Sequence, residues 1–160
     1  MRNLLLLFIL LAIPLTASAQ HTNQYCNAPY NFCLQVPGSF NRIGESKTGD
    51  GQFFTATDGS SLTVYGTYNA LDETLEQHFS RQLATITTDS LKPAPVEIPL
   101  ILKAETHGNS YTLIYQTGNF QNYIYRVLQN NLWQCLEMRF PAAKAPEYEL
   151  QMNRMIKSLR

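Results

Sequence analysis

The 160-residue sequence lacks the short motifs that mark common metal and nucleotide sites. It has no C-x-x-C pair, no H-E-x-x-H helix and no EF-hand loop, so the common zinc and calcium sites are not indicated. The turn Gly49-Asp50-Gly51 is not followed by the Lys-Ser/Thr pair of a phosphate-binding loop. The sequence therefore predicts no metal site and no cofactor.

Histidine is scarce, which bears on catalysis. The three histidines, His21, His78 and His107, are scattered, and there is no G-x-S-x-G nucleophile elbow. A nucleophilic Cys or Ser needs a base within reach. A Cys- or Ser-dependent hydrolase is therefore the least favoured hypothesis, and a His within about 4 Å of a Cys or Ser would support it. We expect the protein not to be an enzyme.

Clusters of basic residues are also missing. Over the whole chain 12 Lys and Arg balance 12 Asp and Glu, and the basic residues do not gather in one segment. Proteins that bind nucleic acid or an anionic membrane surface present clustered Lys and Arg. No nucleic-acid partner is therefore expected.

The chain has only one long apolar run, at its N-terminus. Arg2 precedes the apolar segment Leu4–Ile13, and Ala17-Ser18-Ala19 fits an A-x-A cleavage site. The run is well short of the ~20 residues that a spanning helix needs. Residues 1–19 are therefore predicted to be a signal peptide. It would export residues 20–160, a single domain, to a bacterial periplasm or the extracellular space, with no stable membrane insertion after cleavage.

Cysteine is limited to Cys26, Cys33 and Cys135. In an exported protein one oxidised pair is expected, which leaves one thiol over. The sequence leaves all three pairings open. A Cys26–Cys33 bond would close a short local loop, whereas a pair that includes Cys135 would join the start of the domain to its end and remove more unfolded-state entropy.

One stretch, by contrast, is rich in strand and turn signals. Three two-residue turns follow one another there: Gly108-Asn109, Gly118-Asn119 and Asn130-Asn131. Gly and Asn tolerate the positive φ that two-residue hairpin turns demand. The pattern predicts an antiparallel meander with four strands: Ile101–His107, Ser110–Thr117, Phe120–Gln129 and Leu132–Phe140.

Two amphipathic helices and three shorter strands complete the pattern. An apolar stripe with helical spacing predicts a first helix from an N-cap at Asp72 to Thr88, and its members are Leu75, Phe79, Leu83 and Ile86. A last helix is expected after Pro141, with Pro146 in its first turn. We expect strands at 31–36, 52–57 and 61–67, a frayed segment at 20–24 and a polar loop at 41–51.

Two-residue turns fix the register of the meander, so the residues on each face can be counted. Both faces are apolar in the later strands, with Leu136 and Met138 on one and Trp133 and Cys135 on the other. A sheet with one wet face would alternate between apolar and polar residues. We therefore predict an α+β fold in which helices cover both faces of an antiparallel sheet, an α-β-α sandwich.

A polar cluster falls on one face of the meander. The count places Tyr111 opposite Arg126, Glu137 diagonal to Arg126, and Arg139 opposite Asn122. Two guanidinium groups could hold a carboxylate or phosphate there. The candidate ligand-binding residues are therefore Tyr111, Arg126, Glu137 and Arg139. The alternative interpretation is a structural ion pair partly covered by a helix.

Several short motifs are spread along nearly the whole chain after residue 19. They are Tyr25-Cys26-Asn27, Phe32-Cys33-Leu34-Gln35-Val36-Pro37, Asp50-Gly51 before Phe53-Phe54, Asp58-Gly59 with Leu62-Thr63-Val64, Leu136-Glu137-Met138-Arg139-Phe140-Pro141, and Ile156-Lys157-Ser158-Leu159. In these residues the chain resembles the PsbP-like α-β-α superfamily, in particular its small exported bacterial members. The resemblance implies a sandwich fold and a binding or assembly role, and it brings no catalytic residues.

Together these patterns favour an exported, non-enzymatic accessory or binding protein of the bacterial envelope. Its partner would be an envelope protein or a small ligand. The alternative hypothesis is a small anionic-ligand-binding protein that uses the face with Tyr111, Arg126, Glu137 and Arg139.

Overall fold

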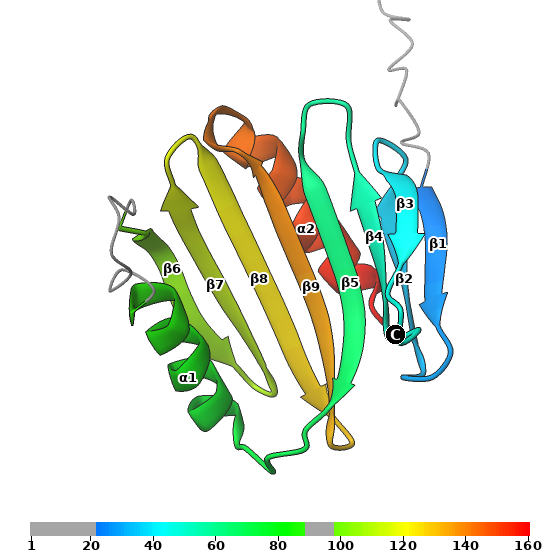
Figure 1. Cartoon of the computed structure of the whole chain (residues 1–160), viewed down its shortest axis with the longest axis vertical. Helices are drawn as coiled ribbons and strands as arrows, with labels where there is room; N and C mark the ends of the chain where they lie inside the picture. The colour runs from blue at the N-terminus through cyan, green and yellow to red at the C-terminus, as the bar shows by residue number, and fades with distance from the viewer. Residues whose placement is uncertain (1–21, 89–97) are drawn as a thin grey trace, which may run out of the picture.

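The computed structural model describes residues 22–88 and 98–160. The predicted signal peptide, residues 1–19, lies outside these ranges. Seven strands form one antiparallel sheet with the order β3-β4-β5-β9-β8-β7-β6, and β1 and β2 form a separate two-stranded sheet (Figure 1). Within the described ranges no helix is long and apolar enough to cross a membrane. The strands are β1 (Thr22–Asn27), β2 (Phe32–Pro37), β3 (Asn41–Glu45), β4 (Gly51–Thr55), β5 (Ser61–Tyr68), β6 (Leu100–His107), β7 (Ser110–Thr117), β8 (Phe120–Gln129) and β9 (Leu132–Pro141).

The predicted meander is confirmed as strands β6 to β9. Each two-residue turn pairs its flanking residues as counted from the sequence: His107 with Ser110, Thr117 with Phe120, and Gln129 with Leu132. The turn residues with positive φ are Gly108, Gly118, Asn130 and Asn131. One departure from the count is a bulge in β6 between Ile101 and Lys103. The register of β7, β8 and β9 holds throughout, so the two faces of these strands are composed as predicted.

Helices cover both faces of the sheet, as predicted (Figure 1). Helix α1 (Leu75–Thr88) packs on the side of β6 and β7. Helix α2 (Ala145–Ser158), preceded by the short 3-10 turn η2 (Ala142–Lys144), packs on the other face beside β2. The apolar residues under α1 include Leu113, Ile124 and Trp133, and those under α2 include Leu62, Leu136 and Met138.

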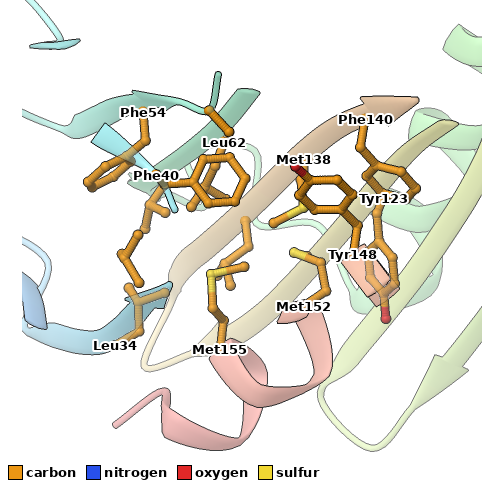
Figure 2. Close-up of a cluster of buried hydrophobic side chains, with 14 of the residues drawn as sticks. Leu34, Phe40, Phe54, Leu62, Tyr123, Met138, Phe140, Tyr148, Met152 and Met155 are labelled. Carbon is orange, nitrogen blue, oxygen red and sulfur yellow. The ribbon is translucent and has the colours of Figure 1, made fainter. Parts of the chain in front are cut away.

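The larger of the two cores lies under α2 (Figure 2). Tyr148, Met152 and Met155 point from the helix into this core, and Met152 and Met155 are fully buried. The Tyr148 ring stacks on Phe140 at 5.1 Å between ring centroids and meets Phe40 edge-on at 6.0 Å. Side chains from β2, β4, β5, β8 and β9 also belong to this core. Strand β2 of the β1-β2 hairpin therefore packs on the same side of the large sheet as α2.

The start of α2 is fixed to the turn between β4 and β5. Asp58 Oδ2 accepts hydrogen bonds from Lys144 Nζ and from the Tyr148 hydroxyl, each at 2.8 Å. Burial alone would raise the pKa of Asp58, but the hydrogen bonds from Lys144, Ser60 and Tyr148 outweigh it and hold this pKa well below its ordinary value. Asp58 therefore stays charged and ties the turn to the helix.

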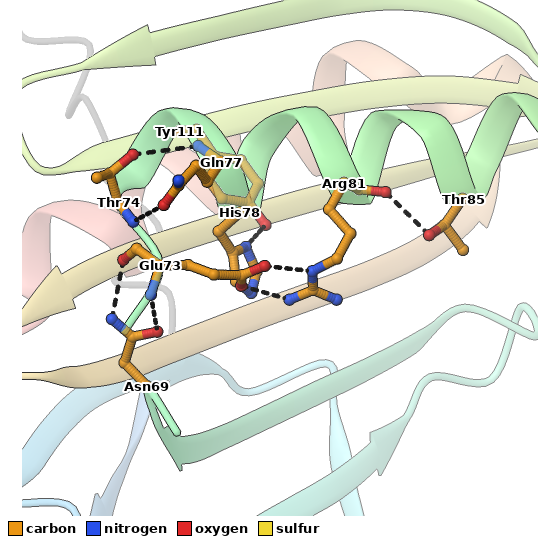
Figure 3. A network of polar contacts seen from close by, with 8 residues as sticks. All are labelled: Asn69, Glu73, Thr74, Gln77, His78, Arg81, Thr85 and Tyr111. Carbon is orange, nitrogen blue, oxygen red and sulfur yellow. Dashed lines mark hydrogen bonds and ion pairs between the residues drawn. The ribbon is translucent and has the colours of Figure 1, made fainter. Parts of the chain in front are cut away.

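Three local predictions were wrong. Residues 22–24 form part of β1 instead of fraying, and β3 lies inside the predicted polar loop. Helix α1 is not capped by Asp72, which has a φ of 48°. Thr74 and Gln77 cap it reciprocally: the Thr74 hydroxyl accepts from the Gln77 backbone N–H, and Gln77 Oε1 accepts from the Thr74 N–H (Figure 3).

The cysteine pairing left open by the sequence is the local one. Cys26 and Cys33 lie directly opposite each other in β1 and β2, with 4.1 Å between their Cα atoms, and form a disulfide. Cys135 is a buried free thiol. The C-terminal residue contacts the same strand: Arg160 and Cys33 form two backbone hydrogen bonds with each other, of 2.8 and 3.1 Å.

Candidate functional site

The four candidate ligand-binding residues all lie on the sheet face that α1 partly covers. Strand pairing arranges this face in rows that run across β5, β9, β8 and β7. The first row is Tyr65, Cys135, Arg126 and Tyr111; the second is Thr63, Glu137, Ile124 and Leu113; the third is Ser61, Arg139, Asn122 and Tyr115. Exposure rises along this series, from a largely buried first row to a third row whose side chains are all exposed or half-buried.

Tyr111 is enclosed beneath α1 (Figure 3). Its side chain is 1% exposed, and its hydroxyl lies 3.0 Å from Nδ1 of His78. The His78 ring lies 4.1 Å from the Trp133 ring, centroid to centroid. Burial, followed by the nearby charges of Arg126 and Arg81, lowers the pKa of His78 to about 4. His78 is therefore neutral at neutral pH, and Tyr111 is held away from solvent.

Arg126 is buried in an ion pair. Its side chain is 8% exposed, and Nη2 lies 2.5 Å from Oε1 of Glu137. Nη1 also donates to Sγ of Cys135 at 3.1 Å, and the Tyr65 hydroxyl donates to the same Glu137 oxygen at 2.8 Å. Arg126 and Glu137 thus have the geometry of a structural ion pair.

Arg139 differs from Arg126 in its exposure and in its lack of an acidic partner. Its side chain is exposed, and its guanidinium lies 3.6 Å from the centroid of the Phe120 ring. It forms no ion pair with any residue in the described part of the chain. A guanidinium stacked on a ring keeps its N–H groups free to bond in its own plane. Of the two arginines, Arg139 is the one that a ligand can reach.

A groove surrounds Arg139 where α1 leaves the sheet uncovered. Two hollows, of about 560 and about 120 Å³, both include Tyr115, Asn122 and Arg139 in their walls. We call this surface the Arg139 groove, formed by Ser61, Thr63, Tyr115, Phe120, Asn122 and Arg139. Glu137 lines its smaller hollow, but Arg126 and Tyr65 already bind the Glu137 carboxylate.

The described residues do not assemble a nucleophile with a base. Burial raises the pKa of the Cys135 thiol to about 11, so this group stays protonated at neutral pH. Among residues 22–88 and 98–160 no hydrogen bond joins a histidine ring to a Cys or Ser: His78 bonds Tyr111, and His21 lies outside these ranges. The same ranges contain no group of three or more His, Cys, Asp or Glu side chains placed to hold a metal ion.

Comparison with known proteins identifies the fold. No family model and no curated protein matches the sequence. Among solved structures, cyanobacterial PsbP (CyanoP) of Synechocystis sp. PCC 6803 matches with a TM-score of 0.68 and 13% identity, over 91% of this chain and 95% of that one. The Ran-binding protein Mog1p of Saccharomyces cerevisiae matches with a TM-score of 0.63 and 9% identity, over 89% of this chain and 96% of that one. The chain thus has a PsbP-like fold, as the sequence motifs implied.

The sequence prediction found Arg139 and its neighbour Asn122 but did not bring Ser61 and Thr63 to the same place. Asn122 was placed opposite Arg139, yet Ser61 and Thr63 were assigned only to a strand. The missing information was that β5 pairs with β9. These two strands are separated by more than 60 residues of sequence, so no local pattern indicates that they are neighbours. The polar character of Ser61, Asn122 and Arg139 was visible in the sequence, and it would have marked an uncovered row once this pairing was known.

Proposed function

We propose that this chain is an exported, non-enzymatic binding or accessory protein of the bacterial envelope, and that it binds through the part of the sheet face that α1 leaves open. The observation that carries the proposal is the Arg139 groove, because the face around it combines accessible polar groups with an exposed aromatic side chain, Phe53. Phe53 pairs with Thr63 and so continues the second row of this face onto β4.

Export is supported by two features of different kinds. The N-terminal segment has the order of a signal peptide, a basic residue followed by an apolar run and an A-x-A site. The Cys26–Cys33 disulfide is typical of proteins that fold in an oxidising compartment. A binding role is supported by the fold, because one structural neighbour is named as a Ran-binding protein.

Site-specific photo-crosslinking tests the binding role. A photo-reactive amino acid placed at Phe53 lies on the open face, and one placed at Asn153 lies on the exposed side of α2 and serves as the matched control. Expressed with its leader in a bacterial host, the Phe53 variant is expected to capture a discrete envelope component that the Asn153 variant does not. Identical captures from both positions, or none from Phe53, would contradict the proposal.

The export step has its own measurement. Mass spectrometry of the protein recovered from the periplasmic or culture fraction is expected to show a chain that begins at Gln20. A chain that retains residues 1–19 in the cytoplasm would contradict export without bearing on the binding face.

A small anionic ligand is the second candidate for what this face binds. The observation that favours it is the exposed guanidinium of Arg139, which has no acidic partner in the described part of the chain.

A further inference from the structure

Five polar side chains of the Arg139 groove are free to bond a ligand. Within residues 22–88 and 98–160, none of them makes a side-chain hydrogen bond to the protein. They are Ser61, Thr63, Tyr115, Asn122 and Arg139. Ser61 and Arg139 are exposed and the other three are half-buried, so all five border solvent. In the first row of the same face, by contrast, the side chains of Tyr65, Arg126 and Tyr111 each make a hydrogen bond within the protein.

The groove carries one uncompensated positive charge. Arg139 supplies it, and the one carboxylate among the described residues that line the two hollows, that of Glu137, is paired with Arg126. A single positive charge balances a single negative charge. A dianionic phosphate would leave one charge unmatched and would place it close to the Glu137 carboxylate.

Strand pairing places two neutral hydrogen-bonding groups beside the Arg139 guanidinium. Ser61 lies directly opposite Arg139 on β5, and Asn122 lies directly opposite it on β8. Side chains that face each other in this way have Cβ atoms about 4.5–5.5 Å apart. A planar carboxylate bonded to the guanidinium fork therefore has an amide on one side and a hydroxyl on the other.

We propose that the Arg139 groove is a binding site for a monoanionic carboxylate. This inference rests on the proposed binding function and assigns a chemical class to what is bound. Arg139 forms the paired bonds to the carboxylate, with Asn122 and Ser61 beside it, and the Tyr115 and Phe120 rings contact the organic part of the ligand. Two kinds of ligand carry such a carboxylate: a small organic acid and the C-terminus of a polypeptide.

Titration of the full mature chain, residues 20–160, with paired probes tests the site. Benzoate is compared with benzamide, and N-acetyl-glycyl-phenylalanine with its C-terminal amide, by following backbone amide resonances in NMR spectra. Each carboxylate is expected to shift the resonances of Ser61, Asn122 and Arg139 and to bind at least about tenfold more tightly than its amide, which corresponds to about 1.4 kcal/mol. Tighter binding of the peptide acid than of benzoate identifies a polypeptide C-terminus, and the reverse identifies a small acid.

Arg139→Gln is the diagnostic variant and Arg42→Gln its control. Arg42 is also an exposed arginine of the same sheet, but it lies on β3 outside the groove. Arg139→Gln is expected to lose at least about tenfold in carboxylate affinity, and Arg42→Gln to bind like the unmodified protein. Because Arg139 is exposed and makes no ion pair in the described part of the chain, loss of its contact with Phe120 is expected to change the melting temperature little. A loss of binding can then not be assigned to unfolding.

Four results would overturn the inference. They are equal binding of a carboxylate and its amide, unchanged binding by Arg139→Gln, tighter binding of inorganic phosphate than of either acid, and no saturable shift up to about 10 mM probe. The crosslinking experiment distinguishes failure of the carboxylate site from failure of the proposed binding function. A partner captured at Phe53 together with no carboxylate binding would retain the binding role and reject the carboxylate site.

Discussion

Acidification between pH 6.5 and 4 is expected to destabilise the protein through His78. The ring is buried under α1, stacked on Trp133 and bonded to Tyr111, and its pKa in the folded state is about 4 against an ordinary value of 6.5. Arg126 and Arg81 oppose a charge on the ring, whereas Glu73 favours it. The folded protein therefore keeps His78 neutral over a pH range in which the unfolded chain binds a proton there.

The sign and size of the effect follow from proton linkage. The unfolded state binds more protons between pH 6.5 and 4, so the free energy of unfolding falls as the pH is lowered through this window. At about 1.4 kcal/mol per pH unit, the whole window corresponds to a loss of about 3 kcal/mol, as an upper limit. Carboxyl groups with lowered pKa values contribute at the lower end of this window and below it, because the ordinary pKa is 3.8 for Asp58 and 4.5 for Glu73.

Urea unfolding at several pH values measures this loss, with fluorescence of the single tryptophan, Trp133, as the signal. His78→Gln is expected to flatten the dependence between pH 6.5 and 4. His107→Gln is the control and should leave the dependence unchanged, since His107 is exposed in β6. NMR titration of the unmodified protein reports His78 directly, so the test stands even if His78→Gln fails to fold. A His78 ring that titrates near pH 6.5 in the folded protein would refute the reasoning.

Three further substitutions are expected to lower the free energy of unfolding, each measured by urea unfolding. Gly66→Ala should cost about 1–3 kcal/mol, because its Cβ would lie 2.2 Å from Cγ of Tyr30; a neutral effect would mean that Tyr30 moves aside freely. Met152→Ala should cost about 2–5 kcal/mol, since Met152 is fully buried under α2, whereas the exposed Asn153→Ala should cost little. Asp58→Asn should cost about 1–2 kcal/mol at neutral pH through the weakened bonds to Lys144 and Tyr148. Because the pKa of Asp58 is lowered, this last difference should shrink as the pH falls below 3.8, and a difference that persisted there would contradict the role of the charge.

Strands β6 to β9 were predictable because local signals determined them. Positive-φ residues at three successive turns set the register of β6 to β9, and the register then predicted two apolar faces and a helix on each. The edge strand β3 gave no such signal. All five of its residues are exposed, so the alternation that identifies a half-buried strand is absent.

The cysteine pairing could not be predicted for a related reason. Cys26 lies in β1, a strand in which four of the six residues are exposed. Apolar residues do not alternate with polar ones in this segment, so no periodic pattern indicated a strand. Without β1 there was no register to set Cys26 opposite Cys33. Once β1 and β2 pair, Cys26 and Cys33 lie opposite each other with 4.1 Å between their Cα atoms, and the disulfide joins them.

The charges on the α1 side of the sheet explain why only one arginine is left for a ligand. A ligand carboxylate that drew Arg126 outward would have to break its bonds to Glu137 Oε1 and to Cys135 Sγ. Binding at Arg139 breaks no ion pair in the described part of the chain. Because Arg126 and Glu137 are bound to each other, neither charge is available to a ligand, and Arg139 is the charge that the groove presents to an anion.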